Sequence, residues 1–168
     1  MIGVNNKFQE LTGILGRQHD ILLQIETVLE RKRQALCGFN RDDLDRATNT
    51  LETLALQMNI LEQARRRTTA EIARRHAVAE ESAGLSWLVS IAPDDQKSDL
   101  DELRDLLRDT SGRVRLLQDR NRVLLINGAQ VVHGLIENVE TTVNPRVTYS
   151  DRAKMSKNRR TSATFRRV

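Results

Sequence analysis

The side chains best able to bind a metal ion or to act as an acid or a base are scattered along the chain. The three histidines, His19, His76 and His133, and the single cysteine, Cys37, never stand three or four residues apart. Two ligands need that spacing to share one face of a helix, so the sequence predicts no metal site. We interpret each histidine as a solvated residue on a helix surface.

The acidic residues show no catalytic arrangement either. Glu80 and Glu81, and the group Asp99, Asp101 and Glu102, lie among arginines in segments with a helical pattern, which is typical of a solvated helix face. The chain contains no Glu-x-x-His motif for a paired-metal site, no glycine-rich phosphate loop and no nucleophile elbow. We therefore expect neither catalysis nor a cofactor.

The C-terminal segment is strongly basic. From Pro145 onward, eight Lys or Arg residues accompany one acid, so this segment carries +7, while the net charge of +4 leaves −3 for residues 1–144. Arginine pairs such as Arg159-Arg160 could neutralise phosphates. The acidic body and the lack of a recognition helix nevertheless argue against specific nucleic-acid binding. We expect residues 145–168 to be a disordered, flexible tail that solubilises the protein or docks a partner.

The composition favours long helices. Of the 168 residues, 30% are charged, eight are glycine, two are proline and five are aromatic. Sandwiches, barrels and doubly wound sheets use more aromatic and β-branched residues, and a turn every ~8 to 12 residues. We predict an all-α fold with one helical domain, residues 1–144.

Apolar residues recur at alternating steps of three and four along three segments. These segments cover residues 5–38, residues 42–82 and about 50 residues from 94 to 144. Three such stripes with short connections predict a long, coiled-coil-like bundle of three main helices that run up, down and up, each antiparallel to the next.

Helix-breaking residues mark the boundaries between these segments. Gly38 predicts the end of the first helix, and Asn40 is a candidate cap for the second. Residues 84–93 read as an apolar connector, with Trp87 against one end of the core, and Pro93 opens the third helix. The run 110–112 (Thr-Ser-Gly) is the place where that helix is expected to kink.

Asn121 stands at a seam position of the third helix, between Leu117 and Leu124. An amide at such a position costs stability but can fix the register of packed helices. Two interpretations therefore stay open, a register device and a contact with a partner.

Several features predict a cytoplasmic protein. The first residues lack the basic start and apolar run of a secretory signal, and one cysteine cannot form an internal disulfide. The longest aliphatic run, residues 123–126, is far shorter than the ~20 apolar residues of a membrane span. We expect no integral association with a membrane.

Two stretches resemble a known family. The sequence Asn-Arg-Val-Leu-Leu at 121–125, followed after Pro145 by Tyr149, is similar to the Asn-x-x-Leu-Leu stretch and C-terminal tyrosine of the FlgN family of flagellar export chaperones. The sequence Leu-Glu-Gln-Ala-Arg at 61–65 is similar to the family's Leu-Glu-x-x-Arg. The chain departs from the family where glycines usually follow the tyrosine, because Ser150 follows here, and its tail is unusually basic.

The resemblance implies a cytoplasmic chaperone that binds the hook-filament junction proteins FlgK and FlgL. It would prevent their premature assembly and deliver them to the export-gate protein FlhA. We expect partner contacts in the later part of the third helix and just beyond it, at Asn121, Leu124, Leu125, Val132, Ile136, Val139, Val143 and Tyr149. For each aliphatic residue among these, the competing interpretation is a place in the bundle core.

Two other functional classes remain open. One is a structural coiled-coil subunit that oligomerises, for instance as a homodimer, through the same seam. The other is a basic-tailed protein that binds nucleic acid or an anionic membrane surface.

Overall fold

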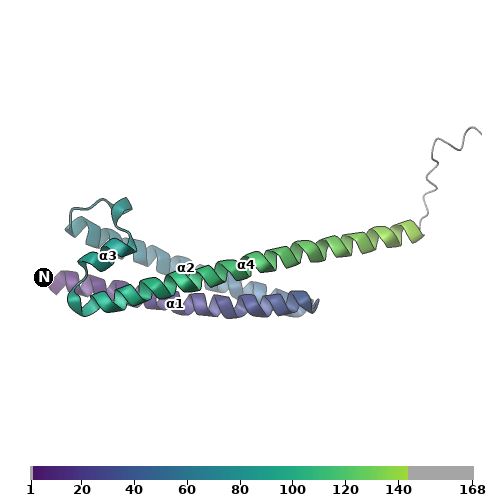
Figure 1. Cartoon of the computed structure of the whole chain (residues 1–168), viewed down its shortest axis with the longest axis horizontal. Helices are drawn as coiled ribbons and strands as arrows, with labels where there is room; N and C mark the ends of the chain where they lie inside the picture. Colours follow the sequence, from purple (N-terminus) through teal and green to yellow (C-terminus); the bar gives the residue numbers. More distant parts are fainter. Residues whose placement is uncertain (1, 144–168) are drawn as a thin grey trace, which may run out of the picture. The chain divides into compact units, whose positions relative to one another are not determined.

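Helices form nearly all of the described part of the chain, with short segments between them. A computed structural model describes the backbone of residues 2–143, and the side chains of residues 6–79 and 81–137. Three long helices are joined by a tight turn and two short helices (Figure 1). In chain order the elements are α1 (Ile2–Cys37), α2 (Arg41–Arg75), η1 (Glu80–Ser82), α3 (Leu85–Ile91) and α4 (Asp94–Val143). The all-α prediction is confirmed, and the predicted tail, residues 145–168, lies outside the described residues.

Internal contacts divide the chain into two compact units. The first is Met1–Ala129, which holds α1, α2, η1, α3 and α4 as far as Ala129. The second, Gln130–Val168, begins within α4 and is described by itself. The predicted boundary between residues 144 and 145 falls at the edge of the described region and stays a prediction.

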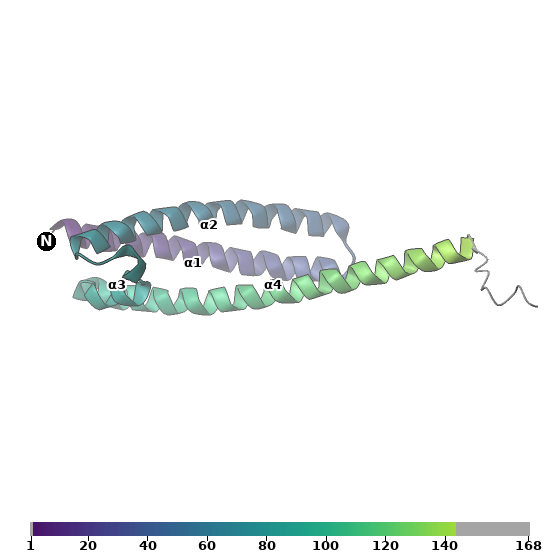
Figure 2. The same ribbon diagram turned by 90° about the horizontal axis from the view of Figure 1, so that it is seen from above.

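Within the first unit, α1 lies beside α2 and runs antiparallel to it (Figure 2). One buried cluster joins these two helices through Ile21 and Val28 of α1 and Ala47 and Leu54 of α2. The buried residues follow steps of three, four and seven, so each helix presents one apolar stripe to the other. This part of the core is built by α1 and α2 alone.

A second buried cluster draws side chains from all four α-helices. Its members are Phe8, Leu11 and Leu15 of α1, Ile72 of α2, Leu88, Val89 and Ala92 from α3 and its end, and Leu100 of α4. Six of these side chains are among the largest that are fully buried, namely those of Phe8, Leu11, Leu15, Ile72, Leu88 and Leu100. This cluster therefore holds most of the large, fully buried side chains of the first unit.

The segment predicted as a connector contributes a helix to that cluster. Residues 84–93 contain α3, which buries Leu88 and Val89, and Trp87 packs half-buried against the same cluster. The prediction of an irregular connector is wrong, because a one-face apolar pattern of seven residues is too short to distinguish from an apolar loop. As predicted, α4 begins after Pro93. Its helical backbone continues unbroken through residues 110–112, the place where a kink is expected from the sequence.

The turn between α1 and α2 uses a different residue from the one predicted. The backbone N–H of Asn40 donates to the carbonyl of Ala35 at 2.9 Å, and that of Phe39 donates to Leu36 at 3.4 Å, which is the Schellman pattern. In this pattern the left-handed residue is Phe39, with φ of 51°, whereas Gly38 keeps a negative φ. The prediction of Asn40 as the cap is confirmed, because its side chain accepts from the backbone N–H of Asp43 at 3.2 Å.

The second helix ends seven residues earlier than predicted, at Arg75 rather than residue 82. A second Schellman pattern closes it, with Val78 N–H donating to the carbonyl of Ala73 at 3.0 Å. Its left-handed residue is Ala77, with φ of 55°. No glycine or proline marks this end, so the sequence held no conventional stop signal.

Candidate partner-binding surface

In the first unit, α4 presents a seam of buried and half-buried residues to the rest of the fold. The seam alternates steps of three and four through Leu100, Leu103, Leu107, Thr110, Val114, Leu117, Asn121 and Leu124. Because α4 turns ~100° per residue, these positions stay on one side of the helix. The seam is apolar except at Thr110 and Asn121, which are 1% and 3% exposed.

Asn121 makes a specific contact with α1. Its side-chain Nδ2 donates to the backbone carbonyl oxygen of Leu29 at 2.9 Å. Its Oδ1 is buried and has no hydrogen-bond partner among the residues whose side chains are described. The structure thus places this candidate in the contact between α4 and α1, with one polar atom unpaired.

A charged pair lies eight residues earlier on α4. Arg113 donates from Nε and Nη2 to the two carboxylate oxygens of Glu26 on α1, at 2.7 and 3.0 Å. The hydrogen bonds from Arg113 hold the pKa of Glu26 below its usual value. The sequence gives no sign of this pair, because the two residues are 87 positions apart and no pattern links them.

The remaining candidates on α4 differ in exposure. In the first unit, Leu124 is half-buried, while Leu125 is 42% exposed. In the second unit, Val132 and Ile136 are 48% and 51% exposed. The side chains of Val139 and Val143, and the whole of Tyr149, lie outside the described residues.

Two further aliphatic residues of the second unit belong with these candidates. Val131 and Leu135 are 58% and 60% exposed, and they stand next to Val132 and Ile136. Residues four positions apart share one face of a helix, so the pair 131 and 132 lies on the same face as the pair 135 and 136. The sequence signal was present, because Val131 and Leu135 continue the three-and-four steps of the α4 seam beyond Leu124.

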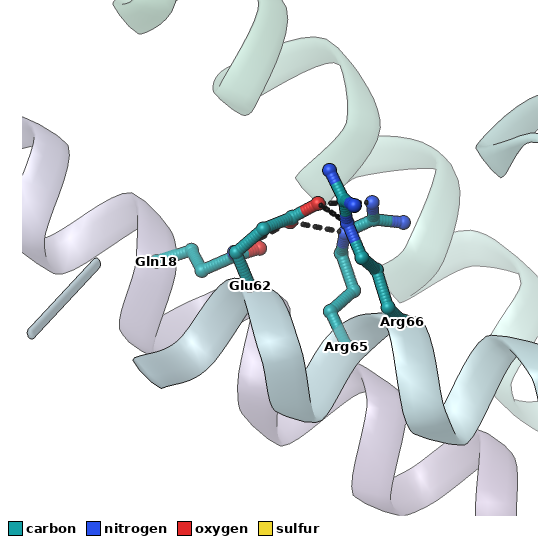
Figure 3. Close-up of polar contacts among 4 residues, drawn as sticks. All are labelled: Gln18, Glu62, Arg65 and Arg66. Atoms are coloured by element: carbon teal, nitrogen blue, oxygen red, sulfur yellow. Dashed lines mark hydrogen bonds and ion pairs between the residues drawn. The ribbon is translucent and has the colours of Figure 1, made fainter. Parts of the chain in front are cut away.

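The Leu-Glu-x-x-Arg stretch forms a polar cluster on α2 (Figure 3). The carboxylate of Glu62 accepts from Arg65 at 2.7 Å through each oxygen and from Arg66 at 2.8 Å. Gln18 of α1 donates to the same carboxylate at 3.4 Å. The hydrogen bonds from Arg65 lower the pKa of Glu62 to about 2. The cluster therefore joins α2 to α1 through a carboxylate that stays ionised at neutral pH.

Three candidate acid or base side chains contact other side chains. Glu62 and Glu26 are each held by arginine, and His76 meets the ring of Trp87 edge-on, with centroids 6.0 Å apart. Over the side chains described, no three His, Cys, Asp or Glu residues converge as metal ligands would. No helix in the described region is both long and apolar enough to cross a membrane.

Comparison with known proteins gives one match. Residues 1–157 match the family model described as FlgN protein, which covers every element from α1 to α4. No curated protein matches the sequence, and no solved structure does.

Proposed function

The chain belongs to the FlgN family of flagellar export chaperones, and from this membership we propose that it serves the flagellar type III export system in the cytoplasm. It binds the hook-filament junction proteins FlgK and FlgL and prevents their premature assembly. It then delivers them to the export-gate protein FlhA. In this proposal the chain is a binding protein without catalytic activity.

One observation carries the proposal of a client site. Four aliphatic side chains of the second unit, Val131, Val132, Leu135 and Ile136, are each 48–60% exposed. Large aliphatic groups gathered on one helix face are typical of a surface that another helix covers. We name these four residues the client face.

The client face suits an amphipathic helix from the end of a junction protein. The apolar stripe of such a helix is the part that drives premature assembly, so covering it on the chaperone keeps the client unassembled. By the helical spacing, Val139 and Val143 extend the client face. Leu125 is a further candidate contact in the first unit, and Tyr149 is the candidate contact with the export gate.

The proposed architecture accounts for how the client face is presented. We assign residues 1–144 to one bundle in which α1, α2 and α4 run up, down and up, and residues 145–168 to a flexible basic tail. The buried cluster shared by α1, α2, α3 and α4 supports the bundle. Leu124 and Asn121 then hold α4 to the bundle instead of contacting the client directly.

A double substitution on the client face tests the proposal. Val132→Ser and Ile136→Ser together should weaken binding of a FlgK or FlgL terminal-helix peptide about tenfold or more, because two aliphatic contacts are lost. The control pair is Leu56→Ser and Ile60→Ser on α2, each 67% exposed, and it should leave binding unchanged. Peptide titration would be followed beside circular dichroism of each variant.

The outcomes separate the proposal from its competitors. Unchanged affinity in a folded client-face variant would move the site elsewhere, and loss of the fold would show that the face belongs to the core. Stable self-association that the same variant abolishes would favour a coiled-coil subunit or homodimer. Binding to nucleic acid or anionic lipid that falls steeply with salt would favour the basic-tail function.

A further inference from the structure

Within the first unit, α4 carries a second apolar row on the side away from its seam. Leu116, Val123 and Ile126 are 50%, 55% and 48% exposed. At ~100° per residue Val123 and Ile126 lie on the side of α4 away from the seam, whereas Leu116 also lines a hollow with Glu26 and Glu30 of α1. All three side chains remain about half exposed within this unit. We name these three residues the outer row.

The outer row follows the spacing of a helix-packing seam. From residue 112 the positions 112, 116, 119, 123 and 126 alternate steps of four and three, which is the repeat that packs one helix along another. Three of these positions are aliphatic, and the other two are Gly112 and Asp119. A Cβ built on Gly112 would meet no atom within 4 Å. An open hollow lies there, lined by Arg108, Asp109, Gly112, Arg113 and Leu116. The row therefore ends in a position where another helix can approach closely.

Arginines border the outer row. Arg108, Arg115 and Arg122 recur every seven residues along one edge, and all three are exposed. No ion pair between described residues uses any of them. On the other edge, Arg120 lies near enough to Glu30 to help lower the pKa of that carboxyl, after the larger effect of Arg33. The edges thus offer a line of cationic groups with free hydrogen-bond donors.

We propose that the outer row is a second docking surface, which binds an amphipathic helix of another protein whose apolar stripe is bordered by Glu or Asp. The apolar spacing supplies the stripe that a helix needs, and the arginine edges select acidic borders. A second copy of this chain fits poorly, because pairing two outer rows would set arginine edges against arginine edges. Asp119 is the only acid between Leu116 and Ile126.

This surface and the client face consist of different residues, which belong to different units. The two proposals can therefore fail independently. A substitution in the outer row should leave the binding of a FlgK or FlgL terminal peptide unchanged.

Designed peptides test the proposal on the full chain. The probe is a fluorescent helical peptide with leucine at heptad seam positions and glutamate on both borders. A second peptide has lysine in place of glutamate, and polyglutamate supplies the charge without an apolar stripe. We expect the acidic peptide to bind, the basic peptide not to bind, and polyglutamate to bind at least tenfold more weakly than the acidic peptide. Raising the salt concentration should weaken the acidic peptide's binding.

Substitutions then locate the site. Val123→Glu should weaken the acidic peptide about tenfold or more, and Arg115→Glu with Arg122→Glu should reverse the preference between the acidic and basic peptides. Ile60→Glu on α2 is the matched control, because Ile60 is also an exposed aliphatic residue, and it should change nothing. Circular dichroism should show the same helix content in all variants.

Several results would overturn the proposal. The first is that the acidic peptide does not bind, and the second is that the acidic and basic peptides bind equally. The third is that polyglutamate binds as tightly as the acidic peptide, which would mean that charge attraction alone explains the binding. Loss of binding in Ile60→Glu would place the contact on another helix. Concentration-dependent dimers that Val123→Glu abolishes would make a second copy the occupant, and loss of FlgK or FlgL peptide binding in Val123→Glu would make the client the occupant.

Discussion

Asn121 of α4 donates its side-chain amide to the backbone carbonyl oxygen of Leu29 of α1 at 2.9 Å, across 92 positions of sequence. Both residues are 3% exposed, so water does not compete for this bond. An apolar side chain at position 121 would pack equally well against several turns of α1, whereas the amide is satisfied only opposite a carbonyl. We therefore propose that Asn121 favours one register of α4 on α1, with the unpaired Oδ1 as its energetic cost.

The first prediction is that Asn121→Leu makes the protein more stable. Leucine has the same branched shape, fills the seam and removes the buried oxygen that lacks a partner. We expect the free energy of unfolding to rise by about 1 kcal/mol or more, measured by urea denaturation. A lower stability would show that the bond to Leu29 outweighs the unpaired oxygen.

The second prediction concerns the turn between α1 and α2. Phe39 adopts φ of 51° with a side chain that is 77% exposed, so its conformation costs energy while its ring contributes little packing. Phe39→Gly should raise the free energy of unfolding by about 1 kcal/mol. Gly38→Ala is the control, because Gly38 has no positive φ and a Cβ there would stand 3.3 Å from the carbonyl oxygen of Gln34. That control should be neutral or slightly destabilising, and a gain there without a gain at Phe39 would contradict the assignment.

The third prediction uses the low pKa of Glu62. Its pKa falls from the usual 4.5 to about 2, chiefly through hydrogen bonds from Arg65. A carboxyl whose pKa is lower in the folded state stabilises the fold above the unfolded pKa, and this contribution disappears as the pH falls through the folded pKa. The stability difference between the protein and Glu62→Gln should therefore be constant above about pH 5 and shrink from there toward pH 2. Denaturation at a series of pH values measures it, and a difference that does not change with pH would contradict the pairing.

The sequence predicted the long helices because their signals are regular. Steps of three and four located α1 and α4 to within a few residues, and Asn40 and Pro93 marked two of the starts. The end of α2 was predicted seven residues too late, since Ala77 adopts a conformation that usually belongs to glycine. That conformation depends on the backbone bonds that close the helix, and these cannot be read from composition.

The candidate surface was predictable only in part, for a different physical reason. The spacing located the aliphatic residues of α4, including Val132 and Ile136, but spacing alone cannot separate a core stripe from an uncovered one. Exposure separates them, because it depends on which side chains pack around each residue. The pair of Arg113 and Glu26 depends in the same way on the register of two helices that are distant in sequence.

The last prediction tests whether α3 is part of the core. Leu88 is fully buried in the cluster that contains Phe8, Ile72 and Leu100, so its side chain joins α3 to three other helices. Leu88→Ala removes this contact and leaves a cavity among long helices that cannot easily close around it. We expect a loss of about 2–5 kcal/mol in the free energy of unfolding, measured by urea denaturation. Leu56→Ala on α2 is the control, because that leucine is 67% exposed and its truncation should cost less than about 0.5 kcal/mol. Equal, small effects at the two positions would mean that residues 84–93 are the loose connector that the sequence first indicated.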